Sequence, residues 1–74
     1  MLLRLGRFLR EKREECGWSQ EDLAHECGLH RTYIGAVERG EYNITVLTLR
    51  TITETLGVSM ADAMAASQPG RRRG

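Results

Sequence analysis

The fold that we predict for this chain depends on one stretch, SQEDLAHECGLHRTYIGAVERG, residues 19–40. It contains two short segments with apolar residues at helical spacing, 19–26 and 30–38, and only a few residues separate them. Gly28 can adopt the positive φ that such a tight turn needs. The pattern predicts a helix-turn-helix unit, although a general αα-corner shows the same spacing. The residues expected to share one core are Leu23, Ala24, Leu29, Ile34 and Val37.

Helix signals continue on both sides of this stretch. Thr45 and Ser59 are capping residues before later segments, and glycines follow the helical stretches. No segment alternates apolar and polar residues over the length of a strand, so we expect an all-α fold. We predict one domain over residues 1–66 and a disordered basic tail over residues 67–74. The predicted helices cover residues 3–15, 19–26, 30–38, 45–56 and 59–66.

Composition limits the classes of function. The chain has 74 residues, of which 41% are hydrophobic and 28% charged, an ordinary mixture for one small globular domain. Such a domain is marginally stable alone and often gains from dimerisation. No apolar run approaches the roughly 18 residues of a membrane span. No Ser/His/Asp constellation, phosphate loop or metal-ligand spacing is present, so we expect no enzyme, cofactor, metal or small-molecule ligand.

The net charge of +1 is unevenly distributed. Arg71, Arg72 and Arg73 supply three of the eleven basic residues, and the rest of the chain contains more acidic than basic residues. A surface that attracts nucleic acid would therefore have to be a local cluster. The arginine tail has three interpretations: an arm that adds non-specific affinity for phosphates, an inert end, or the point where a longer chain was cut.

Two cysteines, Cys16 and Cys27, indicate a reducing, cytoplasmic setting, because small secreted domains usually carry more of them. With His25 and His30 they would make a metal set, but the paired spacing of a zinc site is missing. We expect Cys27 to be a buried small residue on an apolar helix face, with a redox switch as the alternative.

A series of short motifs makes the prediction more specific. They are Ser19–Ala24, Gly28–Leu29, Tyr33–Ile34, Val37–Gly40, Thr48–Leu49, Ile52 and Leu56–Ser59. In this order they resemble the Cro/C1-type (XRE) helix-turn-helix family of DNA-binding proteins over about residues 5–66. His30–Gly35 and Asn43–Thr45 are most similar to the controller proteins of restriction–modification systems. The resemblance implies a compact five-helix domain of the lambda-repressor-like type.

The same resemblance implies a sequence-specific transcription regulator that binds double-stranded DNA as a homodimer on a near-palindromic operator. Similarity to controller proteins further implies autoregulation, and an activator of this kind would also contact RNA polymerase, for which Glu21 and Glu41 are candidate residues. One alternative is an antitoxin-like or prophage regulator whose fold also binds a protein partner. Another is an interaction domain that no longer binds DNA.

Candidate base contacts follow from the family, in which residues 30–38 would be the recognition helix in the major groove. Arg31 would contact O6 and N7 of guanine, or else a phosphate. Thr32 would donate to a base or present its methyl group to thymine. Ala36 would face the groove or a thymine methyl, unless it only fills the helix. Gly35 costs about 1 kcal/mol in mid-helix, which close approach to DNA or neutral drift would explain.

Candidate phosphate contacts lie at the edges of the motif. Gln20 corresponds to a family glutamine that reaches phosphate and braces the recognition helix, at a helix N-terminus that attracts anions. Tyr33, Arg39 and Asn43 are further candidates. The alternative for Tyr33 is a half-buried position against residues 19–26. Three arginines recur on the first helix and would flank the duplex or form a solvated face. They are Arg4, Arg7 and Arg10.

The resemblance also implies a structural ion pair between Arg13 and Glu38, which would join the first helix to the recognition helix. A buried pair adds little net stability, but losing one partner costs about 3–5 kcal/mol. His30 stands where Ser or Thr is common, so the recognition helix would begin more weakly, or His30 itself would reach DNA. Protonated His30 would favour phosphate and give a pH dependence.

Several apolar residues in the last third of the chain form a candidate dimer interface. Leu47 is apolar at a position that is usually polar in the family, and an exposed cluster on one side of a monomer requires an explanation. The alternative is satellite packing against the core. The cluster consists of Leu47, Val58, Met60, Ala61 and Met64.

Overall fold

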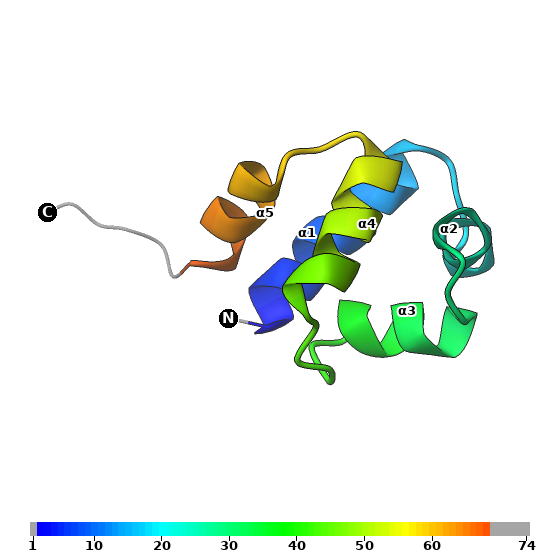
Figure 1. Cartoon of the computed structure of the whole chain (residues 1–74), viewed down its shortest axis with the longest axis horizontal. Coiled ribbons are helices and arrows are strands. Elements are labelled where there is room, and N and C mark those ends of the chain that lie inside the picture. The colour runs from blue at the N-terminus through cyan, green and yellow to red at the C-terminus, as the bar shows by residue number, and fades with distance from the viewer. Residues whose placement is uncertain (1, 69–74) are drawn as a thin grey trace, which may run out of the picture.

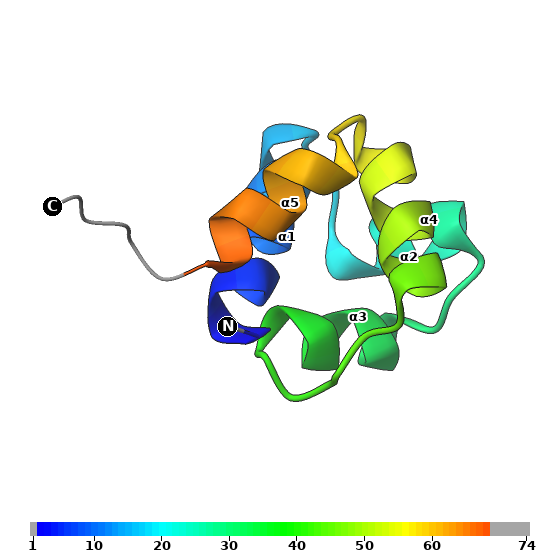
Figure 2. The same ribbon diagram turned by 60° about the vertical axis from the view of Figure 1, so that its left-hand side comes forward.

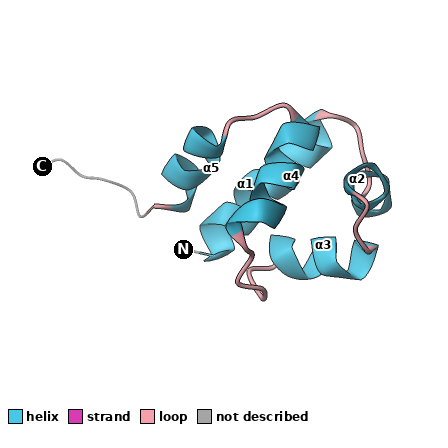
Figure 3. Ribbon diagram, viewed as in Figure 1, coloured by secondary structure: helices cyan, strands magenta, loops and turns pink. Residues whose placement is uncertain are grey.

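The computed structural model describes residues 2–68, which form five α-helices and, over that range, no strand (Figures 1 and 3). The predicted all-α fold with five helices is therefore confirmed. The tail residues Arg71–Arg73 lie outside the described range. The helices are α1 Leu2–Glu15, α2 Gln20–Cys27, α3 Arg31–Glu38, α4 Val46–Leu56 and α5 Met60–Ser67.

Four of these helices, α2 to α5, begin one residue later than predicted because their capping residues stand just outside them. Ser19 accepts a hydrogen bond from the backbone N–H of Asp22, and the Asp22 carboxylate accepts one from the N–H of Ser19, which completes a capping box. This bonding lowers the pKa of Asp22 below its usual value. Thr45 and Ser59 cap α4 and α5, and each accepts a hydrogen bond from the backbone N–H three residues further on.

The last helix extends past the predicted domain boundary. Ser67, which we predicted to begin the tail, belongs to α5 and is buried, and its hydroxyl donates to the carbonyl of Met64 at 2.8 Å. A hydroxyl that bonds to the preceding turn can enter the core without an unsatisfied polar group. None of the described helices combines the length and apolarity that crossing a membrane requires.

The core lies where the five helices converge. Each of them contributes a side chain that is at most 1% exposed: Leu9 of α1, Leu23 of α2, Ile34 of α3, Ile52 of α4 and Ala63 of α5. Helix α1 packs against α3, α4 and α5, and α2 packs against α3 and α4. Figure 2 shows the helices arranged around this centre, with α3 along one side of the molecule. The arrangement leaves Arg31 and Thr32 at the start of α3 exposed, with Tyr33 and Ala36 half-buried.

The α2–α3 unit is the predicted helix-turn-helix. Gly28 ends α2 with φ 71°, and the N–H of Leu29 donates to the carbonyl of Ala24 at 2.8 Å, which satisfies a helix-end carbonyl. Leu29 then packs against the core and the chain enters α3. The predicted turn at Gly28 is thus confirmed.

Helices α1 and α3 approach each other closely at Gly6. A β-carbon on Gly6 would collide with the backbone carbonyl groups of Val37 and Glu38. Only the absence of a side chain lets the two helices meet here, and sequence reasoning assigned no role to this glycine. The contact sets the position of the C-terminal end of α3.

Candidate nucleic-acid interface

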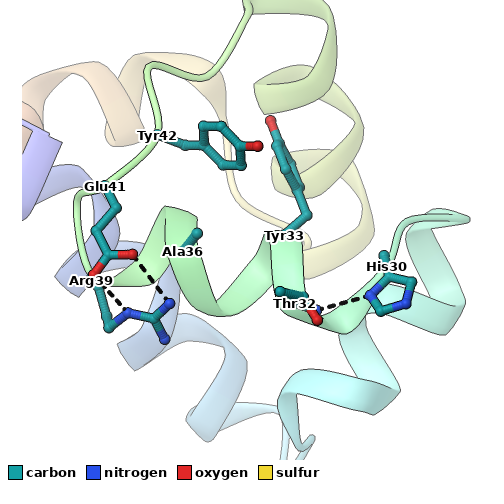
Figure 4. A pocket seen from close by; sticks show the side chains of 7 residues that line it. All are labelled: His30, Thr32, Tyr33, Ala36, Arg39, Glu41 and Tyr42. Atoms are coloured by element: carbon teal, nitrogen blue, oxygen red, sulfur yellow. Dashed lines mark hydrogen bonds and ion pairs between the residues drawn. The ribbon is translucent and has the colours of Figure 1, made fainter.

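The uncovered side of α3 borders an open hollow of about 490 Å³ (Figure 4). We expected no hollow of this size from the sequence. Four predicted site residues, Thr32, Tyr33, Ala36 and Arg39, come together there. The other lining residues are His30, Glu41 and Tyr42. Because these side chains come from α3 and the residues on either side of it, the hollow follows the outer side of α3.

The N-terminal end of α3 carries the candidate Arg31, which is exposed. It lines a second depression together with Glu21 and His25 of α2. His30 caps the helix, because its Nδ1 accepts a hydrogen bond from the N–H of Thr32 at 3.2 Å. The imidazole therefore replaces the Ser or Thr that is common at this position.

Arg39 and Glu41 form an ion pair at the edge of the hollow. The guanidinium donates from Nε to Oε2 of Glu41 at 2.9 Å and from Nη2 to Oε1 at 3.2 Å, as the dashed lines in Figure 4 mark. Both side chains are 58% exposed. Hydrogen bonding to Arg39 lowers the pKa of the Glu41 carboxyl below its usual value, so this carboxylate is charged at neutral pH.

An aromatic pair forms the opposite wall. The rings of Tyr33 and Tyr42 lie with centroids 4.9 Å apart and planes tilted by 42°, an arrangement typical of favourable aromatic contacts. Tyr33 is half-buried and Tyr42 is 50% exposed. Sequence reasoning did not name Tyr42 as a site residue, although a tyrosine in the polar segment between α3 and α4 was a usable signal.

The predicted ion pair between Arg13 and Glu38 is present, and it is buried. Arg13 donates from Nε at 2.7 Å and from Nη2 at 3.0 Å to the two oxygens of Glu38, and from Nη1 to the carbonyl of Trp18 at 2.7 Å. Glu38 raises the pKa of Arg13 above its usual value. These bonds tie α1, the segment before α2 and the end of α3 into one unit.

Gln20 belongs to the same network. Its Nε2 donates to Oε1 of Glu38 at 3.0 Å, so one of its two amide protons is committed to bracing α3 and the other remains for a further acceptor. Its Oε1 lies beside Gly35. A β-carbon on Gly35 would be 3.2 Å from this oxygen and 3.1 Å from Nη1 of Arg39. The mid-helix glycine therefore makes room for these two side chains.

Asn43 does not join the other candidate phosphate contacts around the hollow. It is exposed and lines a separate, apolar groove formed with residues of α1, α4 and α5. Among the candidate flanking arginines, Arg10 is paired with Glu14 on α1 at 3.1 Å. Arg4 and Arg7 line a small depression beside α5.

The candidate dimer residues divide into two groups. Leu47 and Met64 are 75% and 42% exposed, and Ala61 is exposed as well. Val58 and Met60 are half-buried and pack against the core, which is the alternative that we considered for the cluster. Two large apolar residues that sequence reasoning missed are also exposed, Leu3 at 64% and Val46 at 70%. Val46 lines the apolar groove together with Met64.

The cysteines occupy ordinary positions. Cys27 is half-buried against the core, and burial raises the pKa of its thiol, while Cys16 is exposed. A thiol with a raised pKa is a poor nucleophile at neutral pH.

A helix-turn-helix whose second helix begins with the exposed donors Arg31 and Thr32 defines a class of DNA-binding regulators. The helix-turn-helix family model matches residues 9–62, and the chain belongs to that family. It is 41% identical over 63 residues to the control protein C.BamHI of Bacillus amyloliquefaciens, covering 84% of this chain and 78% of that protein. A hypothetical transcription factor of Neisseria meningitidis is 51% identical over 43 residues, which span 58% of this chain and 41% of that protein.

Solved structures agree with this assignment. The restriction-modification controller protein C.AhdI of Aeromonas hydrophila superposes with a TM-score of 0.81 at 37% identity, over 84% of this chain and 94% of that one. The tetramer of the controller protein C.Esp1396I in complex with its natural 35 base-pair operator matches with a TM-score of 0.77 at 36% identity, over 86% and 84% of the two chains. The predicted resemblance to controller proteins is therefore confirmed.

Proposed function

We propose that this protein is a sequence-specific regulator of transcription that binds double-stranded DNA with α3 in the major groove. The observation that carries the proposal is the outer side of α3, where Thr32, Ala36 and Arg39 border one hollow and the exposed Arg31 lies at the N-terminal end. An α-helix fits the major groove, and its N-terminal side chains then face base edges. The C.Esp1396I complex with its operator supports this interpretation by similarity.

Within that arrangement, Arg31, Thr32 and Ala36 would read bases. A bidentate contact from Arg31 to guanine would discriminate by about 1–3 kcal/mol. Tyr33 and Arg39 would contact phosphates beside them. Gln20 retains one amide proton for a phosphate while it braces α3. Asn43 would reach phosphate only at the far edge of the contact, because it lies on a different part of the surface.

A homodimer is the second element of the proposal. One recognition helix covers few base pairs, and two-fold dimers bind half-sites roughly 34 Å apart on successive turns of the major groove. The apolar surface that includes Leu47, Val46 and Met64 is a candidate for an isologous interface, with Ala61 at its margin. Val58 and Met60 would support it from beneath, since both pack against the core.

Similarity to controller proteins suggests the target: the DNA upstream of the protein's own gene, in the cytoplasm, with RNA polymerase as a further partner if the regulator activates. The test is binding to that upstream duplex and to a shuffled duplex across a salt series. A specific regulator binds the upstream site at least about a thousandfold more tightly. Equal affinity for the two duplexes would place the operator elsewhere, and no binding to either would refute the DNA-binding proposal.

The interface is tested separately with the variant Leu47→Glu. A charge in an apolar interface should yield monomers in sedimentation and weaker operator binding, while circular dichroism shows the same helix content as wild type. A variant that remains dimeric would exclude Leu47 from the interface. The prediction that α3 binds DNA would be unaffected by that result.

A further inference from the structure

In the free protein, Arg39 already has an anionic partner, Glu41. Its guanidinium presents Nε and Nη2 to both oxygens of Glu41, at 2.9 and 3.2 Å. This two-pronged geometry is the one by which arginine binds phosphate as well as carboxylate. Because Glu41 is only two residues further along the chain, its carboxylate is always within reach of Arg39. The Nε and Nη2 donors, with which Arg39 would bind a phosphate in the same geometry, are thus occupied in the free protein.

The position of the pair matters as much as its geometry. Arg39 and Glu41 line the same hollow as Thr32 and Ala36, and Glu41 is the one acidic residue among those that line it. In Figure 4 the pair lies beside Ala36, at the other end of the hollow from His30. A duplex seated against α3 therefore meets this carboxylate at the same place as the guanidinium.

The pair is also open to exchange. Both side chains are 58% exposed, and exposed ion pairs contribute little to stability, so an incoming phosphate can replace the carboxylate at small cost. Arg13 and Glu38, with side chains 9% and 3% exposed, cannot exchange partners without opening the core. Two chemically alike pairs at the same end of α3 thus differ in whether a ligand can compete for the arginine.

We propose that Glu41 acts as an intramolecular stand-in for a DNA phosphate on Arg39 and thereby lowers the affinity of the protein for the DNA backbone. The inference rests on the proposed function. When DNA binds, Arg39 passes from one anion to another, and the released carboxylate takes up a counterion from the solution. This uptake offsets the counterion that Arg39 displaces from the DNA, so the net release is smaller than the number of arginines suggests.

The experiment compares Glu41→Gln with a matched control, Glu54→Gln. Glu54 pairs with Arg50 on α4, both 65% exposed, and lies outside the hollow, so the control removes the same charge elsewhere. We measure binding to a shuffled duplex across a salt series by fluorescence anisotropy. Glu41→Gln should bind roughly two- to fivefold more tightly than the control. Its plot of log affinity against log salt should be steeper by about 0.9 for each bound subunit.

A cycle with Arg39→Gln tests whether Glu41 acts through Arg39. In that background, adding Glu41→Gln should change neither the affinity nor the salt slope beyond the change produced by Glu54→Gln. A gain that persists without Arg39 would overturn the proposal, because Glu41 would then act by simple repulsion of the duplex. So would a Glu41→Gln variant that matches Glu54→Gln while wild type binds DNA. If no protein binds any duplex, the proposed function fails, and this inference falls with it.

Discussion

Two adjacent residues at the end of α3 hold opposite kinds of arginine–carboxylate pair. Glu38, the last residue of the helix, points inward to Arg13, with side chains 3% and 9% exposed. Arg39, the next residue, points outward to Glu41, and both of these side chains are 58% exposed. Each pair uses Nε and Nη2 of the arginine to bind both oxygens of the carboxylate. They differ in burial rather than in chemistry.

Burial decides what each pair can do. Removing charges from water is costly, so the inner pair adds little net stability. Removing one partner alone would nevertheless strongly destabilise the protein, because the other charge would remain buried and unpaired. The inner pair is also fully bonded, because Arg13 binds Trp18 and Glu38 binds Gln20 as well. The outer pair remains hydrated and screened, and it is free to exchange with another anion. One pair fixes where α3 lies, and the other adjusts how α3 meets a ligand.

The largest effect is expected from breaking the inner pair. Glu38→Ala leaves Arg13 charged and buried without its partner, so the free energy of unfolding should fall by about 3–5 kcal/mol. Operator affinity should fall with it, because α3 loses its brace. Urea denaturation measures the change, and Glu14→Ala, which removes an exposed partner of Arg10, is the control. A Glu38→Ala protein that melts like wild type would show that the buried pair does not hold α3.

An intermediate effect is expected where α1 touches the same end of α3. Gly6→Ala places a methyl group against the carbonyl groups of Val37 and Glu38, and the helices must separate to admit it. We expect a loss of about 1–3 kcal/mol in the free energy of unfolding. Thermal melts of Gly6→Ala and of Arg7→Ala, at the exposed neighbouring position, measure the difference. Equal melting temperatures would mean that α1 and α3 are not in close contact there.

The smallest effect on stability is expected at the outer pair. The pKa of Glu41 is lowered by Arg39, so any stability from the pair is present above the usual carboxylate pKa and is lost as the pH falls through the lowered value. Glu41→Gln should therefore melt almost like wild type at neutral pH, and the two should converge completely in acid. Melting temperatures across a pH series test this. If Glu41→Gln lowered the melting temperature at neutral pH as much as Glu38→Ala does, the two pairs would not differ in their contribution to stability.

Much of the fold follows from local features of the sequence. Helical periodicity, the capping box of Ser19 and Asp22 and the turn at Gly28 each depend on residues within a few positions of one another. Such signals can be read from the sequence because a helix satisfies its backbone hydrogen bonds internally. Few distant contacts are therefore needed to specify it. The inner pair and the candidate face on α3 were also predicted, but through resemblance to a known family rather than through spacing.

The sequence by itself therefore determined the five helices, the caps at Thr45 and Ser59, and the core that α2 and α3 share. Only the tertiary structure decided that Val58 and Met60 turn inward while Val46 stays exposed, that Gly6 meets the end of α3, and that Asn43 leaves the hollow. It also decided that Glu38 is buried while the adjacent Arg39 is not. The physical reason is that burial and close approach depend on how separate helices pack, and residues distant in the sequence determine that packing.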